Sequence, residues 1–162
     1  MSRRTTFMLT GMALLGLVTT LPQVSFGQSN PLTGTWKINL AKSKYSPGPG
    51  PRSGTTIFEA AGQGLRIIAE GIDAQGSPTK VDYGVSELDG KSSAATGTPD
   101  YDAQAVTRVD ANTIVANRTK AGKLVQIVII RVAPDGKTRT VTTTGINAKG
   151  QPLDNIAFYD KQ

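Results

Sequence analysis

The chain has 162 residues, carries 18 lysines and arginines against 12 aspartates and glutamates, and contains neither histidine nor cysteine. These two absences exclude a Ser-His-Asp triad, a cysteine nucleophile, a Cys/His zinc site and a His-ligated haem. They also exclude disulfides, so the core alone must stabilise the fold.

The first 27 residues have the pattern of a secretory signal peptide. Arg3 and Arg4 precede a compact apolar run over 7–18. Small residues, Ser25 and Gly27, stand at the two recognition positions of a signal-peptidase site, which predicts cleavage after Gly27. The apolar run is shorter than the ~20 residues that span a bilayer, which disfavours the alternative of an uncleaved anchor. We therefore expect an exported protein, periplasmic or extracellular, that does not span the membrane.

The remaining segment, 28–162, is expected to form one β-domain with a formal charge of +4, because the leader removes two arginines and no acids. Short runs rich in Val, Ile, Thr and Tyr alternate with Gly, Asp, Asn and Pro turns, and no window shows a helical apolar period. The predicted strands are 34–40, 54–61, 65–72, 79–88, 91–96, 104–109, 113–119, 123–133, 138–146 and 154–160.

Short connections make consecutive strands antiparallel neighbours. A meander buried on one face must protect its two edges, and closing into a barrel removes them. The competing arrangement is a β-sandwich, which usually needs longer crossovers, and only the Pro- and Gly-rich segment 41–53 is long enough. We therefore predict an all-β fold, an antiparallel up-and-down barrel of about eight to ten strands.

Alternation assigns faces within two of these strands. Trp36 lies on the apolar face of the first strand and is expected to fill the core. In the fourth strand, Tyr83 shares a face with Val81 and Val85, and Ser86 lies on the other.

An eight-residue segment occurs twice. Gly71–Pro78 and Gly145–Pro152 match at five of eight positions, 74 residues apart, with Asp73 in one and Asn147 in the other. Both side chains form Asx-type turns, so one shared conformation is expected, although a chance match of common turn residues is the alternative. Both loops follow odd-numbered strands, whose loops emerge at one end of a meander and mark a candidate mouth.

The Gly34-Thr35-Trp36 opening resembles the G-x-W start of the calycins, which include the lipocalins and the fatty-acid-binding proteins. The longer stretch 34–49 is similar to exported, uncharacterised bacterial proteins of lipocalin-like type, through the motif G-T-W-K-x-N-L-x-K-S-K-Y. Toward the C-terminus, a strand ending in Arg131, a D-G-K turn, a Thr-rich strand and the final Phe158-Tyr159-Asp160-Lys161 resemble the fatty-acid-binding proteins.

This resemblance implies a barrel that encloses a small apolar ligand. In fatty-acid-binding proteins two arginines and a tyrosine bind the ligand carboxylate; Arg131 matches one arginine and Tyr159 the tyrosine. Ala157 stands where the second arginine is expected, and segment 41–53 replaces their helical cap. The candidate ligand-binding residues are therefore Arg131, Tyr159 and Tyr83.

Alternation leaves two of these candidates open. Both faces of 123–133 are apolar, so Arg131 is interior if the odd-numbered residues face inward and solvated if the even-numbered residues do. Tyr159 shares the less apolar face with Ala157 and Asn155, which favours the outside, against the resemblance. Whichever face of 123–133 is outward needs cover, which predicts a docking surface or homodimer.

The remaining acids do not form a recognisable catalytic or metal site. Most aspartates stand in predicted turns, the glutamates are dispersed, and Asp100-Tyr101-Asp102 lacks the spacing of a calcium loop. No stripe of basic and aromatic residues indicates nucleic-acid binding.

We expect no catalytic residue, metal or cofactor. We expect a non-enzymatic binding protein for a small, mostly apolar ligand inside the barrel. The alternative is a structural or interaction protein of the cell envelope whose barrel is filled by its own side chains.

Overall fold

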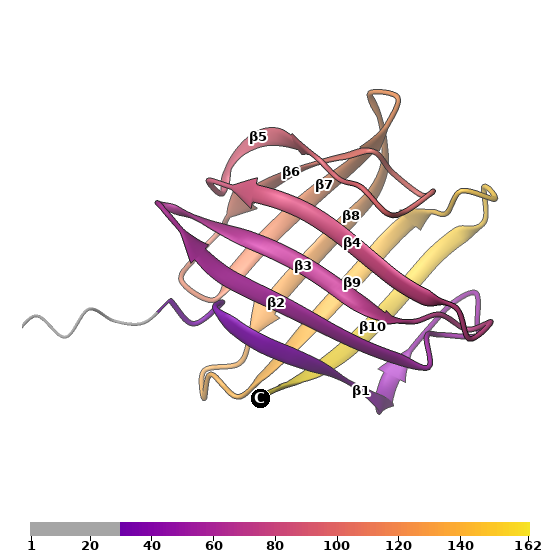
Figure 1. Ribbon diagram of the computed structural model, residues 1–162, viewed down its shortest axis with the longest axis horizontal. Helices are drawn as coiled ribbons and strands as arrows, with labels where there is room; N and C mark the ends of the chain where they lie inside the picture. The colour runs from indigo at the N-terminus through magenta and orange to yellow at the C-terminus, as the bar shows by residue number, and fades with distance from the viewer. Residues whose placement is uncertain (1–29) are drawn as a thin grey trace, which may run out of the picture.

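The computed structural model of the chain describes residues 30–162, which form ten strands and no helix (Figure 1). The strands are β1 (Gly34–Lys44), β2 (Ser53–Ala61), β3 (Gly64–Ile72), β4 (Pro78–Ser86), β5 (Asp89–Ala94), β6 (Ala103–Arg108), β7 (Thr113–Lys120), β8 (Lys123–Val132), β9 (Thr138–Ile146) and β10 (Pro152–Lys161). The predicted leader over 1–27 lies outside the described residues. Within 30–162 no helix is long and apolar enough to cross a membrane.

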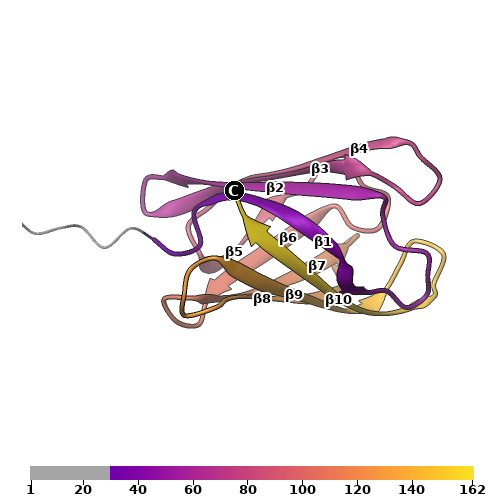
Figure 2. The same ribbon diagram turned by 90° about the horizontal axis from the view of Figure 1, so that it is seen from below.

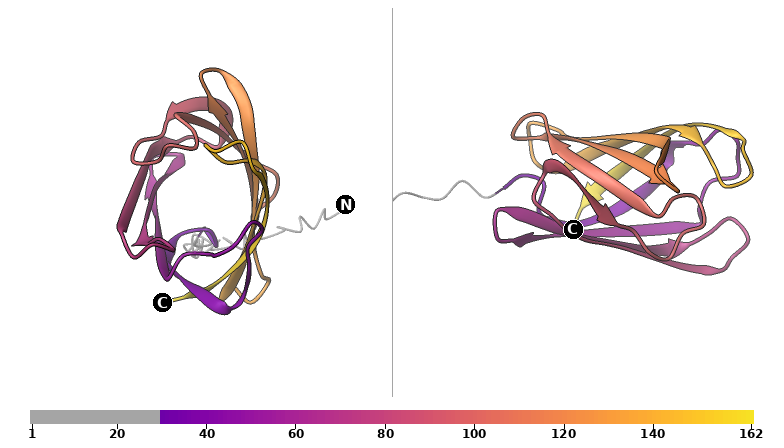
Figure 3. Two further views of the ribbon diagram at one scale, coloured as in Figure 1. Left: turned by 90° about the vertical axis from the view of Figure 1, so that its right-hand side faces the viewer. Right: turned by 90° about the horizontal axis from the view of Figure 1, so that it is seen from above.

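The strands form one antiparallel sheet that curls into a nearly closed barrel. Their order is β4-β3-β2-β1-β10-β9-β8-β7-β6-β5, and Figure 3 shows them surrounding a common axis. The two edges meet where Asp82 and Thr96 exchange backbone hydrogen bonds of 3.3 and 3.1 Å. Gly97 has a φ of +87°, and a Cβ there would strike the carbonyl oxygen of Lys80, so the closure requires a glycine. The predicted up-and-down barrel is confirmed, and the sandwich is excluded.

β1 runs four residues beyond its expected end, so the connection to β2 covers only 45–52 rather than 41–53. A bulge follows Asn39, whose side-chain oxygen accepts a hydrogen bond from the Lys42 backbone N–H (3.3 Å). Pairing with β10 resumes at Lys44, opposite Ile156. Alternation alone does not predict this continuation, because a bulge interrupts the period of two.

A second bulge changes the faces of β4. Gly84 adopts a φ of +64° and donates its N–H to the Asp82 carboxylate (2.8 Å), and the register shifts at this point. Tyr83 faces inward as expected, but Val85 is exposed and Ser86 is buried. The expected faces of these last two residues were therefore wrong, since an inserted residue reverses the inward and outward positions that follow it.

The two ends of the barrel differ. At one end, here called the Trp36 end, Trp36 and Leu32 have no exposed surface, and the indole Nε1 donates to the Leu32 carbonyl oxygen (3.1 Å). At the other, here called the mouth end, lie the loops 45–52, 73–77, 95–102, 121–122 and 147–151. In Figure 2 the wall of β2, β3 and β4 faces the wall of β8, β9 and β10.

The two repeated segments adopt the same turn. The Asp73 carboxylate accepts backbone hydrogen bonds from Gln75 (2.9 Å) and Ser77 (2.8 Å). The Asn147 side-chain oxygen accepts the equivalent bonds from Lys149 (3.0 Å) and Gln151 (2.9 Å). The shared conformation expected from the sequence is therefore present at both sites.

The structure shows which face of β8 lies inside the barrel, which alternation left open. Gln126, Val128, Ile130 and Val132 are buried, whereas Ile127 and Ile129 are each 38% exposed on the outside. Arg131 belongs to the outward set and is exposed, which corrects the ligand-binding position that the resemblance to fatty-acid-binding proteins implied. Solvation of this arginine is the less costly arrangement, because β8 offers no carboxylate partner inside the barrel.

Candidate functional site

The interior of the barrel holds a cavity of about 240 Å³. Its lining comes from β2 to β4, from β6 to β10 and from the first loop of the mouth end, where Tyr45 and Pro51 lie. Much of the wall is aliphatic: Ile67, Ala69, Val106, Ile114, Ala116, Val128, Ile130, Val141 and Ala157. Small inward side chains leave the space that larger ones would fill.

Arg139, on β9, is the most deeply buried charged residue of the lining, with 2% of its surface exposed. Its guanidinium lies 4.5 to 4.8 Å from the ring centroids of Phe58, Tyr159 and Trp36. It donates one hydrogen bond, from Nη2 to the Thr56 hydroxyl, and its Nε and Nη1 find no partner among the described residues. This group is therefore buried with two unused donors.

Burial lowers the pKa of Arg139 to about 9, and the nearby Tyr159 partly opposes that shift. The guanidinium therefore stays protonated at neutral pH. Burial raises the pKa of Tyr159, with the Arg139 charge as a smaller opposing effect. Both groups keep their protons across the neutral range, which suits them to donate hydrogen bonds rather than to exchange protons.

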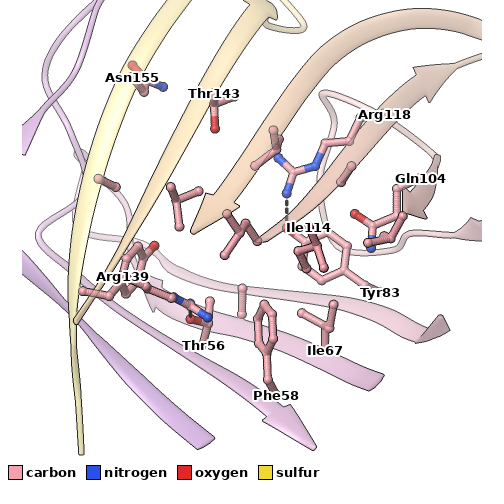
Figure 4. A pocket seen from close by; sticks show the side chains of 18 of the residues that line it. Thr56, Phe58, Ile67, Tyr83, Gln104, Ile114, Arg118, Arg139, Thr143 and Asn155 are labelled. Atoms are coloured by element: carbon pink, nitrogen blue, oxygen red, sulfur yellow. Dashed lines mark hydrogen bonds between the residues drawn. The ribbon is translucent and has the colours of Figure 1, made fainter. Parts of the chain in front are cut away.

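Arg118, on β7, enters the cavity from the opposite side (Figure 4). Its Nη2 donates to the Tyr83 hydroxyl (3.0 Å) and its Nη1 to the side-chain oxygen of Gln126 (3.2 Å). The Tyr83 hydroxyl also shares a hydrogen bond with Tyr101 (2.8 Å), and the guanidinium lies 4.3 Å from the Tyr101 ring centroid. The Arg118 Nε is buried and unpaired within residues 30–162.

The cavity is positively charged without a matching acid. Neither aspartate nor glutamate occurs among its lining residues in the described part of the chain. Every hydrogen-bond partner of the two guanidiniums is an uncharged side chain. Across residues 30–162 no three acidic residues gather where they could hold a metal ion. The unpaired N–H groups of the two guanidiniums can donate hydrogen bonds to acceptors in the cavity, most favourably to negatively charged ones.

The structure brings together two of the three residues expected from the sequence. Tyr83 and Tyr159 both line the cavity, whereas Arg131 lies outside the barrel. The more apolar face of β10 was expected to lie inside, which placed Tyr159 outside, and this expectation was wrong. Ala157, on the same face as Tyr159, is buried, whereas Ile156 on the opposite face is 37% exposed. The inward face of β10 is the more polar one because it lines a polar part of the cavity.

Sequence reasoning missed the two interior arginines. Their signal is alternation: Arg118 has the same parity as the inward Ile114 and Ala116, and Arg139 the same parity as Val141. Apart from Arg139 and Val141, all residues of β9 are threonine, glycine or isoleucine. Hydropathy therefore distinguishes the two faces of this strand poorly. Arginine is rarely buried without a partner, so this general tendency gives no reason to expect Arg118 or Arg139 inside the barrel.

The fold and the cavity define an antiparallel up-and-down β-barrel with a charged, partly apolar interior. No protein-family model matches this chain, and no curated protein matches its sequence.

Proposed function

We propose that this chain is an exported, non-enzymatic binding protein that holds a small, mostly apolar molecule with an acidic group inside the barrel. The observation that carries the proposal is Arg139: within residues 30–162 its buried guanidinium has two unpaired donor nitrogens, and the lining of its cavity includes no carboxylate. The resemblance to lipocalin-like and fatty-acid-binding proteins supports the same interpretation.

The physical reason is the cost of an uncompensated charge. A buried ion loses its hydration and regains that free energy only through a partner that also satisfies its hydrogen bonds. A carboxylate of a ligand would accept from the Arg139 Nε and Nη1 in a charge-assisted pair. The aliphatic wall around it suits the apolar part of the same molecule.

The size of the cavity favours a compact ligand. A volume of about 240 Å³ corresponds to about eight waters, at about 30 Å³ each. It lies below the ~300–1,000 Å³ typical of sites for drug-sized molecules. Exchange would occur at the mouth end, where Tyr45 and Pro51 belong to the lining.

Export is part of the proposal and rests on the leader pattern over 1–27. The chain carries no cysteine, so folding after export would need no disulfide.

The test is to express the full chain with its own leader in a bacterial host and to purify it from the exported fraction. Native mass spectrometry should give a mature mass beginning at Gln28, with an adduct that is lost on denaturation. Octanoate should then bind the stripped protein. Arg139→Gln should abolish binding, while the matched change Arg131→Gln outside the barrel should leave it intact. A bare mass that binds no ligand would instead favour a structural protein.

We also propose that the outward face of β8 mediates a homodimer. Leu124, Ile127 and Ile129 are 56%, 38% and 38% exposed on this strand, and such neighbouring apolar side chains favour contact with another surface. Ile129→Lys should convert a dimer into a monomer in sedimentation velocity. Val85→Lys, an equal change at an exposed position of β4, should not. A wild-type protein that sediments as a monomer would exclude the dimer.

A further inference from the structure

We infer that the ligand carries two acidic groups, one at each end of a short apolar body. One would pair with Arg139 near the Trp36 end, and the other with Arg118 toward the mouth end. This inference rests on the proposed binding function and specifies the class of its ligand: a short-chain dicarboxylate.

Strand register separates the two arginines. Arg118 lies opposite Gln126, which in turn lies opposite Gly145 on β9. Arg139 is on the same β9 strand, six residues before Gly145. At about 3.3 Å per residue, the backbone positions therefore differ by about 20 Å along the strand direction. Arg139 is near the start of its strand, and Arg118 near the end of β7 that leads to the mouth.

The side chains shorten this distance without bringing the two guanidiniums to one point. Arg139 contacts Thr56 and the rings of Trp36, Phe58 and Tyr159. The surroundings of Arg118 are Tyr83, Tyr101 and Gln126. The hydrogen bonds and ring contacts of the two guanidiniums involve different residues, although Tyr159 acts electrostatically on both arginines. Figure 4 shows Arg118 and Arg139 on opposite sides of the cavity.

The charge count requires two acids. Two guanidiniums face an interior whose described lining includes no carboxylate, so a ligand with one negative charge would leave one of them uncompensated. Asp100 is the acid whose charge acts on Arg118, but it lies outside the cavity lining and accepts a hydrogen bond from the Ala148 N–H (2.8 Å). Arg118 retains a buried, unpaired Nε that a ligand oxygen would satisfy.

The wall between the two arginines determines the middle of the ligand. Val106, Ala116 and Val128 form its aliphatic part, whereas Thr143, which pairs with Val128, and Asn155, which pairs with Thr143, line the cavity at the same level with polar side chains. A short methylene chain suits the aliphatic part of this wall, because it has no hydrogen bonds to water to lose on burial. A compact dianion such as a phosphate monoester is disfavoured, because both its charges would sit at one end.

The experiment compares octanedioate, octanoate and octyl phosphate by calorimetry on the stripped, exported protein. We expect octanedioate to bind at least about tenfold more tightly than octanoate, since a hydrogen-bonded charge pair contributes that much. Arg118→Gln should remove this preference, so that octanedioate and octanoate bind this variant with affinities within about twofold of each other. Arg131→Gln, the matched control outside the barrel, should retain the preference.

A second measurement uses the wild-type protein, so that the test does not depend on a variant that fails to fold. Octanedioate should shift the NMR signals of the Nε–H groups of both Arg118 and Arg139, whereas octanoate should shift only that of Arg139. Octanoate binding as tightly as octanedioate, or tightest binding of octyl phosphate, would overturn the two-ended ligand while preserving the binding function. Failure of all three compounds to bind would overturn the binding function itself.

Discussion

The Trp36 end and the mouth end of this barrel hold a positive charge in different ways. At the Trp36 end, Arg139 is packed among three aromatic rings, one of which is the fully buried Trp36, and has one hydroxyl acceptor. Toward the mouth end, Arg118 belongs to a hydrogen-bonded chain with Tyr83, Tyr101 and Gln126. The first arrangement combines apolar burial with an unsatisfied charge, and the second disperses its charge through polar partners. Stability should therefore depend more strongly on the Trp36 end.

The largest effect should come from Trp36→Ala. This side chain has no exposed surface and forms the base of the Arg139 site, so its removal should lower the free energy of unfolding by about 3–5 kcal/mol. Urea unfolding followed by far-UV circular dichroism is the suitable measurement, because the variant contains no tryptophan. A loss below about 1 kcal/mol would mean that the Trp36 end does not anchor the barrel.

Arg139→Met should act on the same end in the opposite direction. Replacing an uncompensated buried ion by an apolar side chain of similar length should raise the free energy of unfolding of the ligand-free protein by about 1–3 kcal/mol. The rings that surround the guanidinium would instead contact the thioether, which recovers part of the lost attraction. The same variant should lose the ligand. Stabilisation with loss of binding would identify Arg139 as a functional residue, whereas destabilisation would show that the ring contacts outweigh the burial cost.

Tyr83→Phe tests the polar chain that leads to the mouth end. It removes the hydroxyl that Arg118 and Tyr101 share, and we expect a loss of about 1–2 kcal/mol in urea unfolding. Tyr159→Phe is the matched control, since its hydroxyl makes no hydrogen bond within residues 30–162, and its effect should be smaller. Equal effects of the two changes would contradict the contrast between the ends.

The sequence predicted the architecture well because strands and turns are local features. Nine of the ten strands begin and end within two residues of their expected bounds. The exception is β1, which continues through a bulge where the Asn39 side-chain oxygen accepts a hydrogen bond from the Lys42 backbone N–H. Bulges depend on such side-chain contacts and leave little trace in hydropathy.

The candidate site was predicted only in part. Tyr83 and Tyr159 line the cavity, but the interior arginines are Arg118 and Arg139 rather than Arg131. Which face of a strand is interior is decided by register across the whole barrel, and hydropathy cannot decide it where both faces of β8 are apolar. A binding cavity also places polar residues inside, which is the arrangement that a hydropathy count rejects.

The smallest effects should come from the two repeated turns at the mouth end. Asp73→Ala and Asn147→Ala each remove a side-chain oxygen that accepts two backbone hydrogen bonds, and each should cost about 0.5–1.5 kcal/mol in urea unfolding. Because the turns belong to different hairpins, the double variant should lose the sum of the two. Asp73→Asn should restore nearly all the stability, since Asn147 already supports the same turn. A loss of unfolding free energy larger than the sum in the double variant would show that the mouth end unfolds as one cooperative unit. A marked loss of unfolding free energy in Asp73→Asn would show that the two turns, although alike in geometry, are not interchangeable.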